Sequence, residues 1–151
     1  MSVSVVIPTW KRVDFLIRAL DGLARQTRQP DEVILGVRRE DSFTLSYLER
    51  REEDGLKIRV VLLDKSGAVA SMQAGIDASI GDYVCLLDDD AEPLEDWLER
   101  ITSCFENHSD LGAVGGRDLL SYLSEDEREQ SLQFTVGIIS PTGKIYGNHH
   151  C

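Results

Sequence analysis

Short apolar runs rich in β-branched residues alternate along this chain with segments whose apolar residues recur every three or four positions. The first pattern predicts buried strands and the second predicts amphipathic helices. We expect strands at residues 3–7, 32–37, 58–63 and 83–87, a short one at 112–116 and a further one within 134–139. Helices are expected from Asp14, over 44–53 with closure by Gly55, over 66–80, and from Pro93 onward. This alternation predicts an α/β fold, a mostly parallel sheet with helices on both faces.

The third of these helices has its apolar positions at helical spacing: Val69, Met72, Ile76 and Ile80. Right-handed crossovers place the turns after the first four strands at one edge of the sheet. Those turns hold residues 8–12, 38–41, 64–67 and 88–90, which are the most polar and most unusual segments of the chain. We therefore expect a ligand site at this edge, where open α/β sheets bind their ligands.

Three consecutive carboxylates, Asp88, Asp89 and Asp90, end the fourth predicted strand. Adjacent like charges repel one another, but they become favourable around a hard divalent cation such as Mg²⁺ or Mn²⁺ that also binds phosphate. In extended backbone Asp88 and Asp90 would point the same way and Asp89 elsewhere. The alternative is a helix cap with solvated charge, although one aspartate is enough for a cap.

The other turns offer weaker signals, each with an ordinary structural explanation. Thr9 and Trp10 suit a ribose and a nucleobase, or form a simple turn with a packed ring. Arg38 is a base or phosphate contact, or a solvated cation. Gly67 at a helix start indicates a phosphate loop or a cap. His149 and His150 are either metal or phosphate ligands or part of a disordered terminus.

Composition narrows the class of protein. The chain has 151 residues, of which 42% are hydrophobic, and we expect one domain over residues 1–151. A net charge of −11 argues against nucleic acid as a partner. Three cysteines without metal-knuckle spacing are typical of a reduced, cytoplasmic protein. No apolar run approaches about 18 residues, which leaves peripheral membrane association open.

The order of these motifs resembles the family 2 glycosyltransferases with a GT-A fold. The resemblance covers nearly the whole chain and rests on Val5–Arg12, Gln26–Thr27, Glu32–Ile34, Gly67, Ala74–Ile76, Gly81–Tyr83, Leu87–Asp90 and the tail Gly143–His150. It implies metal-dependent, inverting transfer of a sugar from a UDP- or GDP-sugar to a saccharide or lipid acceptor.

The resemblance also implies roles for particular residues. Pro8, Thr9 and Trp10 would contact base and ribose, Asp88 would approach the ribose, and Asp90 would hold the metal. The full expected donor-binding set is Pro8, Thr9, Trp10, Arg12, Arg38, Asp41, Lys65, Gly67, Asp88 and Asp89. The expected metal ligands are Asp88 and Asp90, with His149 and His150 as further candidates.

Two departures from the family pattern bear on function. Val37 and Arg38 stand where the family usually has two aspartates, one of which bonds the base, and Asp41 is the nearest carboxylate. Met72–Gln73 replaces a common Arg-Asn pair. The family's catalytic base normally follows this segment, so we expect a chain truncated before the acceptor-binding region, with exposed apolar surface and self-association.

Two other functions remain open. One is a nucleotide-binding module without turnover. The other is a metal-dependent sugar-phosphate nucleotidyltransferase, which the glycine-free turn Pro8–Arg12 disfavours.

Overall fold

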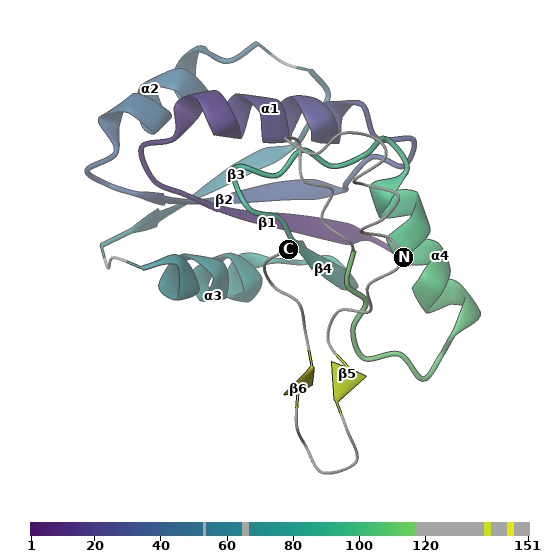
Figure 1. Cartoon of the computed structure of the whole chain (residues 1–151). Helices are drawn as coiled ribbons and strands as arrows, with labels where there is room; N and C mark the ends of the chain where they lie inside the picture. Colours follow the sequence, from purple (N-terminus) through teal and green to yellow (C-terminus); the bar gives the residue numbers. More distant parts are fainter. Residues whose placement is uncertain (53, 65–66, 117–137, 140–144, 147–151) are drawn as a thin grey trace. The chain divides into compact units, whose positions relative to one another are not determined.

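The computed structural model describes residues 1–52, 54–64, 67–116, 138–139 and 145–146 (Figure 1). The chain forms two compact units, Met1–Val114 and Gly115–Cys151. In the second unit, β5 (Ile138–Ile139) pairs antiparallel with β6 (Ile145–Tyr146). The strand expected within 134–139 is thus found at its last two positions, and residues 134–137 lie outside the described part of the chain.

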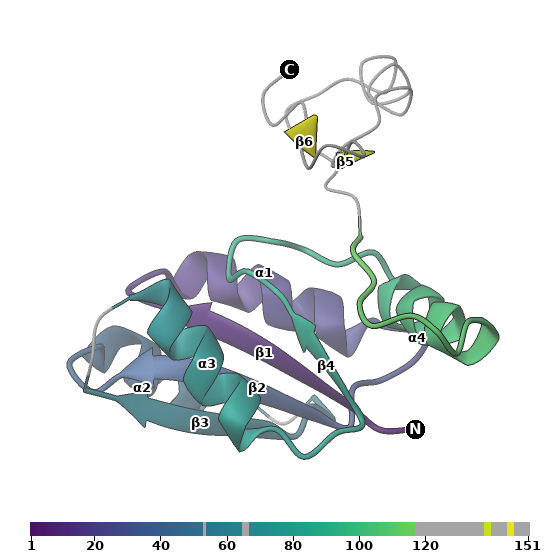
Figure 2. The same cartoon turned by 90° about the horizontal axis from the view of Figure 1, so that it is seen from below.

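The first unit alternates strands and helices as the hydrophobic pattern predicts. In chain order they are β1 (Val3–Thr9), α1 (Val13–Ala24), β2 (Glu32–Arg38), α2 (Ser42–Arg50), β3 (Ile58–Leu63), α3 (Ala68–Ala78), β4 (Tyr83–Leu86) and α4 (Trp97–Asn107). The four strands are parallel and lie in the order β3-β2-β1-β4, which Figure 2 shows from below. The predicted parallel α/β sheet is confirmed.

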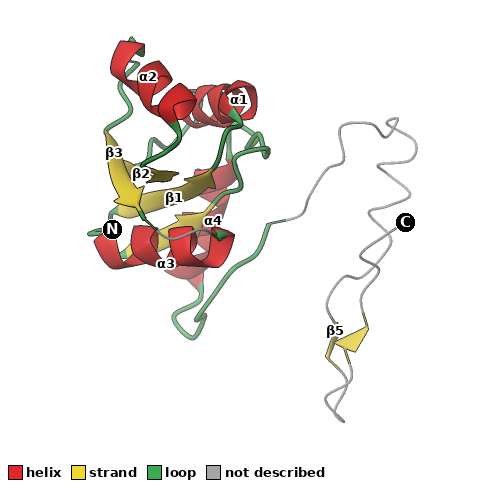
Figure 3. Ribbon diagram, turned by 90° about the vertical axis from the view of Figure 1, so that its left-hand side faces the viewer, coloured by secondary structure: helices red, strands yellow, loops and turns green. Residues whose placement is uncertain are grey.

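Helices cover both faces of this sheet, with α1 and α2 on one side and α3 on the other (Figures 1 and 3). The core lies on the α1 side, where Val5 of β1 is in register with Val33 of β2 and with Cys85 of β4. Leu98 of α4 belongs to the same buried cluster. Burial raises the pKa of the Cys85 thiol to about 11, so Cys85 packs as a small neutral side chain in this core.

Small residues mediate the packing of α3 on the opposite face. Its buried residues are Ser71 and Gly75. A Cβ on Gly75 would lie 2.3 Å from Cγ1 of Val6, and one on Gly36 would lie 2.1 Å from Oγ of Ser71. The helix therefore approaches the strands more closely than large side chains would permit. Of the four apolar positions that the helical spacing singled out, Val69, Ile76 and Ile80 are exposed, and Met72 is half-buried.

Three sequence predictions are wrong in detail. The helix expected from Pro93 begins at Trp97. The second helix begins at Ser42, because Asp41 caps it, and it ends at Arg50 rather than reaching 53 and closing at Gly55. Residues 112–116 form no strand. No described residue lies within 4 Å of an added Cβ at Gly112 or Gly115, so within the described part of the chain this segment has no neighbour against which a strand would be buried.

A charged network holds the amino-terminal edge of the sheet together. Glu32 accepts hydrogen bonds from the Ser4 hydroxyl at 2.6 Å and the Ile80 N–H at 2.8 Å, and it pairs with Arg59 at 2.9 Å. Burial alone would raise the pKa of Glu32, but these hydrogen bonds and the Arg59 charge together lower it below its usual value. The network joins β1, β2 and β3 to the segment after α3.

Candidate functional site

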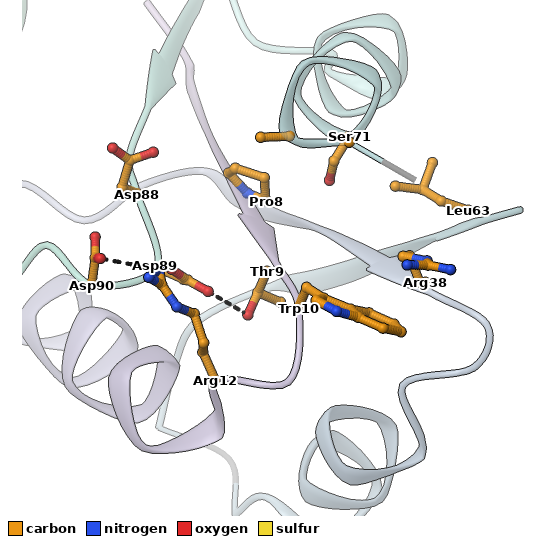
Figure 4. Close-up of a pocket in the computed structure, with 12 residues that line it drawn as sticks. Pro8, Thr9, Trp10, Arg12, Arg38, Leu63, Ser71, Asp88, Asp89 and Asp90 are labelled. Carbon is orange, nitrogen blue, oxygen red and sulfur yellow. Dashed lines mark hydrogen bonds and ion pairs between the residues drawn. The ribbon is translucent and has the colours of Figure 1, made fainter. Parts of the chain in front are cut away.

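A pocket of about 580 Å³ opens at the carboxyl ends of the strands (Figure 4). It is lined by residues from four strand ends and from α3: Pro8, Thr9, Trp10, Arg12, Arg38, Leu63, Gly67, Ala68, Ser71, Asp88, Asp89 and Asp90. Because β1 lies between β2 and β4, the winding of the sheet reverses here. Open α/β sheets bind ligands at such a switch point, and the polar turns meet there as the sequence predicted.

The three aspartates have different environments. Asp89 is 4% exposed, and its carboxylate accepts hydrogen bonds from the Thr9 hydroxyl at 2.8 Å and from Arg12 at 2.7 Å. Asp88 and Asp90 are exposed at the pocket. The Asp88 side chain forms no hydrogen bond or ion pair with the part of the chain that the structure describes. Asp89 therefore ties β1 to the turn after β4, while its two neighbours are accessible to a ligand.

Arg12 contacts two of these carboxylates. Its guanidinium contacts Asp89 at 2.7 Å and Asp90 at 3.0 Å. The hydrogen bond to Asp89 and the charges of both carboxylates raise the pKa of Arg12 above its ordinary value. Because the Arg12 and Asp90 side chains are 48% and 44% exposed, solvent weakens their contact, and a ligand can replace it at little cost.

The turn after β1 has an unusual backbone that a buried carboxylate holds in place. Lys11 adopts φ 55, a left-handed conformation uncommon outside glycine. Its N–H donates to Asp41 at 2.6 Å, and Asp41 also accepts from the N–H and hydroxyl of Thr44. Asp41 is fully buried and does not line the pocket. It caps α2 and positions the turn that carries Trp10 and Arg12, rather than facing a ligand.

Arg38 lies over the Trp10 ring, with Cζ 3.9 Å from the ring centroid (Figure 4). One terminal nitrogen pairs with Glu40 at 2.6 Å. The buried Nε has no hydrogen-bond partner among the described residues. Stacking on an aromatic face and pairing with Glu40 restrict the guanidinium to one orientation beside the pocket.

The amino-terminal end of α3 forms another wall. Gly67, with φ 120, is the N-cap and supplies no side-chain cap hydrogen bond, so no described side chain competes with an anion for the N–H groups of the first turn. The Ser71 hydroxyl donates to the Gly36 carbonyl at 3.1 Å. Sequence reasoning missed three lining residues, Leu63, Ala68 and Ser71. The only signal for Ser71 was its position one turn after Gly67.

A divalent cation would find two exposed carboxylates here, Asp88 and Asp90. Among the described residues, no three His, Cys, Asp or Glu side chains converge as a ready metal cage. Two carboxylates fit Mg²⁺ or Mn²⁺ that completes its coordination with water and ligand phosphates. The remaining expected ligands, Lys65, His149 and His150, lie outside the described residues. In the described part of the chain, no helix combines the length and apolar character needed to cross a membrane.

Sequence comparison places the chain among known proteins. Residues 4–148 match the family described as "Glycosyl transferase family 2". The amylovoran biosynthesis glycosyltransferase AmsB of Erwinia amylovora is 31% identical over 147 residues, covering 95% of this chain and 48% of AmsB. The glucosyl-dolichyl phosphate glucuronosyltransferase of Haloferax volcanii is 32% identical over 123 residues, covering 77% of this chain and 38% of that enzyme. The chain thus spans about half the length, or less, of these relatives.

Solved structures share the fold. TarS of S. aureus in complex with UDP-GlcNAc superposes with a TM-score of 0.64 at 21% identity, covering 80% of this chain and 37% of that structure. The mannosyltransferase PcManGT of Pyrobaculum calidifontis, in complex with GDP-Man and Mn²⁺, gives 0.61 at 23% identity, covering 68% and 32%. The predicted GT-A fold is confirmed.

Proposed function

This chain belongs to glycosyl transferase family 2, and we propose that its pocket binds a nucleoside diphosphate sugar for transfer of the sugar to an acceptor. The observation that carries the proposal is that one pocket contains both the exposed carboxylates Asp88 and Asp90 and the N-terminus of α3, where Gly67 provides no side-chain cap. The carboxylates suit a divalent cation and the helix end suits a phosphate. A protein of net charge −11 needs such groups to hold a diphosphate.

Asp88 and Asp90 would hold Mg²⁺ or Mn²⁺, and the diphosphate would complete its coordination. When bound, this cation supplies Lewis-acid stabilisation of the charge on the departing nucleoside diphosphate. Arg12 contacts Asp90 at 3.0 Å, and it balances this carboxylate's charge until the metal and donor bind. Asp89 keeps the turn in place through Thr9, whose oxygen still has acceptor capacity for a ribose hydroxyl.

The acceptor side of the reaction is a separate part of the proposal. As the family resemblance implies, transfer would invert the anomeric configuration, with a saccharide or lipid hydroxyl as acceptor. The relatives are about twice as long as this chain, or longer, which supports placing acceptor recognition in a region outside the donor pocket. The pocket described above accounts for donor binding and for departure of the nucleoside diphosphate.

The test is isothermal titration calorimetry of the chain with UDP and GDP, each with and without MnCl₂. Two carboxylates bind a bare cation weakly, so we expect little heat with MnCl₂ alone. We expect at least one nucleotide to bind roughly tenfold or more tightly when Mn²⁺ is present. Failure of both nucleotides to bind with Mn²⁺ would reject the proposal.

The metal role is tested by Asp90→Asn, which removes one charged ligand with little change in shape. We expect this variant to lose the enhancement by Mn²⁺. Glu92→Gln is the matched control, because Glu92 is an exposed carboxylate two positions further on that pairs with Arg25 and does not line the pocket. It should retain the enhancement. If Asp90→Asn also retains it, the metal is not held as proposed.

A further inference from the structure

We infer that the donor nucleotide carries guanine, and that Arg38 recognises it. This inference rests on the proposed function, because it concerns the base of the nucleotide that the pocket would bind. The pocket has two chemically different ends. Figure 4 shows Asp88, Asp89 and Asp90 at one end, and Trp10 with Arg38 at the other. A diphosphate at the aspartates, with its metal, directs the nucleoside toward Arg38.

The Arg38 end of the pocket is rich in donors. Arginine carries only hydrogen-bond donors, at fixed angles. Here the Cζ atom lies over the Trp10 ring, 3.9 Å from its centroid, and one terminal nitrogen pairs with Glu40. The Nε is buried and out of reach of a ligand, so a base would meet the terminal nitrogens. A preorganised donor group of this kind favours a ligand edge that presents acceptors side by side.

The nearby carboxylates are already engaged. Both oxygens of buried Asp41 accept hydrogen bonds from Lys11 and Thr44. Asp64 accepts from Arg39 at 2.7 Å, and Glu40 pairs with Arg38 itself. In the described part of the chain, therefore, these carboxylates already have partners, and a base N–H would have to compete with Lys11 and Thr44, with Arg39 or with Arg38 to reach one.

The bases differ in how they meet a donor. Guanine presents two adjacent acceptors, O6 and N7, to which arginine binds in a bidentate manner. Uracil presents an N3–H between its two carbonyl oxygens, and that N–H would face the cation without an acceptor. Cytosine has adjacent acceptors, O2 and N3, but offers a smaller ring to the pocket. The geometry at Arg38 thus favours guanine over uracil, with cytosine between them.

Competition titration against GDP, UDP and CDP at one MnCl₂ concentration tests this order, since the three ligands share the diphosphate. We expect GDP to bind about 10- to 100-fold more tightly than UDP, the discrimination typical of a bidentate arginine contact. Arg38→Met retains an unbranched side chain to lie over Trp10 but removes every donor, and it should bring GDP to the affinity of UDP. Arg50→Met is the control, because Arg50 is an exposed residue of α2 that is absent from the pocket lining. It should preserve the preference.

The outcomes separate this inference from the proposed function. UDP binding as tightly as GDP would overturn the inference and leave the proposed function standing. CDP binding as tightly as GDP would overturn the assignment to guanine. An equal loss of all three nucleotides in Arg38→Met would assign Arg38 to the diphosphate and also overturn it. Binding of none of the three to the unmodified chain would overturn both.

Discussion

Asp89→Asn should destabilise the protein although the changed residue lies among three aspartates at a ligand pocket. Its carboxylate is 4% exposed and accepts a 2.8 Å hydrogen bond from Thr9, which is itself 5% exposed. A hydrogen bond to a charged group contributes about 1.5–3 kcal/mol. The contact with Arg12 adds little to stability, because that side chain is half-exposed and solvent screens the pair.

We therefore expect Asp89→Asn to lower the free energy of unfolding by about 2 kcal/mol, since the amide must bury a donor beside Thr9 and Arg12. For a chain of this size that corresponds to a fall in Tm of about 4–8 °C. Thermal unfolding followed by circular dichroism measures the change. Asp90→Asn is the control, and it should stay within about 0.5 kcal/mol because Asp90 is exposed. Equal losses in the two variants would refute the division of roles among the aspartates.

Two further predictions concern the stability of the first unit, one through the packing of α3 and one through the charged network at Glu32. Gly75→Ala should lower the free energy of unfolding, because the added Cβ would lie 2.3 Å from Val6. Overpacking of this kind costs about 1–3 kcal/mol, and the better helix propensity of alanine offsets about 1 kcal/mol of it. Urea unfolding should show this loss but none in Gly115→Ala, where the space is open; similar effects at both positions would refute it. Folding lowers the pKa of Glu32 below its usual 4.5, so its stabilisation is present above pH 4.5 and is lost as pH falls through the folded-state pKa. The Tm advantage over Glu32→Gln should be full at pH 7 and shrink below pH 4.5, and a constant difference down to pH 3 would contradict this.

Much of the site could be predicted from the sequence because strand ends and turns are local features. The apolar run before Asp88 predicted a strand, and parallel strands bring their carboxyl-end turns to one edge. Alternation along extended backbone predicted that Asp89 would face away from Asp88 and Asp90. Asp89 alone of the three is buried, but the backbone at residues 89–90 is a turn, so the turn and not strand alternation separates them. Arg38 was placed at the same edge by its position at the end of a predicted strand.

The sequence did not predict which side of α3 packs against the sheet. Apolar periodicity predicted that the helix would pack through its large apolar residues, such as Ile76 and Ile80, yet it packs through Ser71 and Gly75. Hydrophobic spacing reports which residues favour burial, but close packing depends on the shape of the surface opposite, and Gly36 with Val6 leaves room only for small groups. Likewise, nothing near Asp41 in the chain indicated that a turn 30 residues earlier would use its carboxylate.

Order along the chain was thus sufficient for the four strands of the parallel sheet, the family and the edge that carries the chemistry, because each follows from short-range pattern and chain connectivity. Contacts between distant segments were needed to show that Asp41 supports a turn, that Asp89 joins β1 to β4, and that Trp10 orients Arg38. Whether a polar side chain is free for a ligand depends on which partners the fold brings to it, and those partners here lie 28 to 80 positions away.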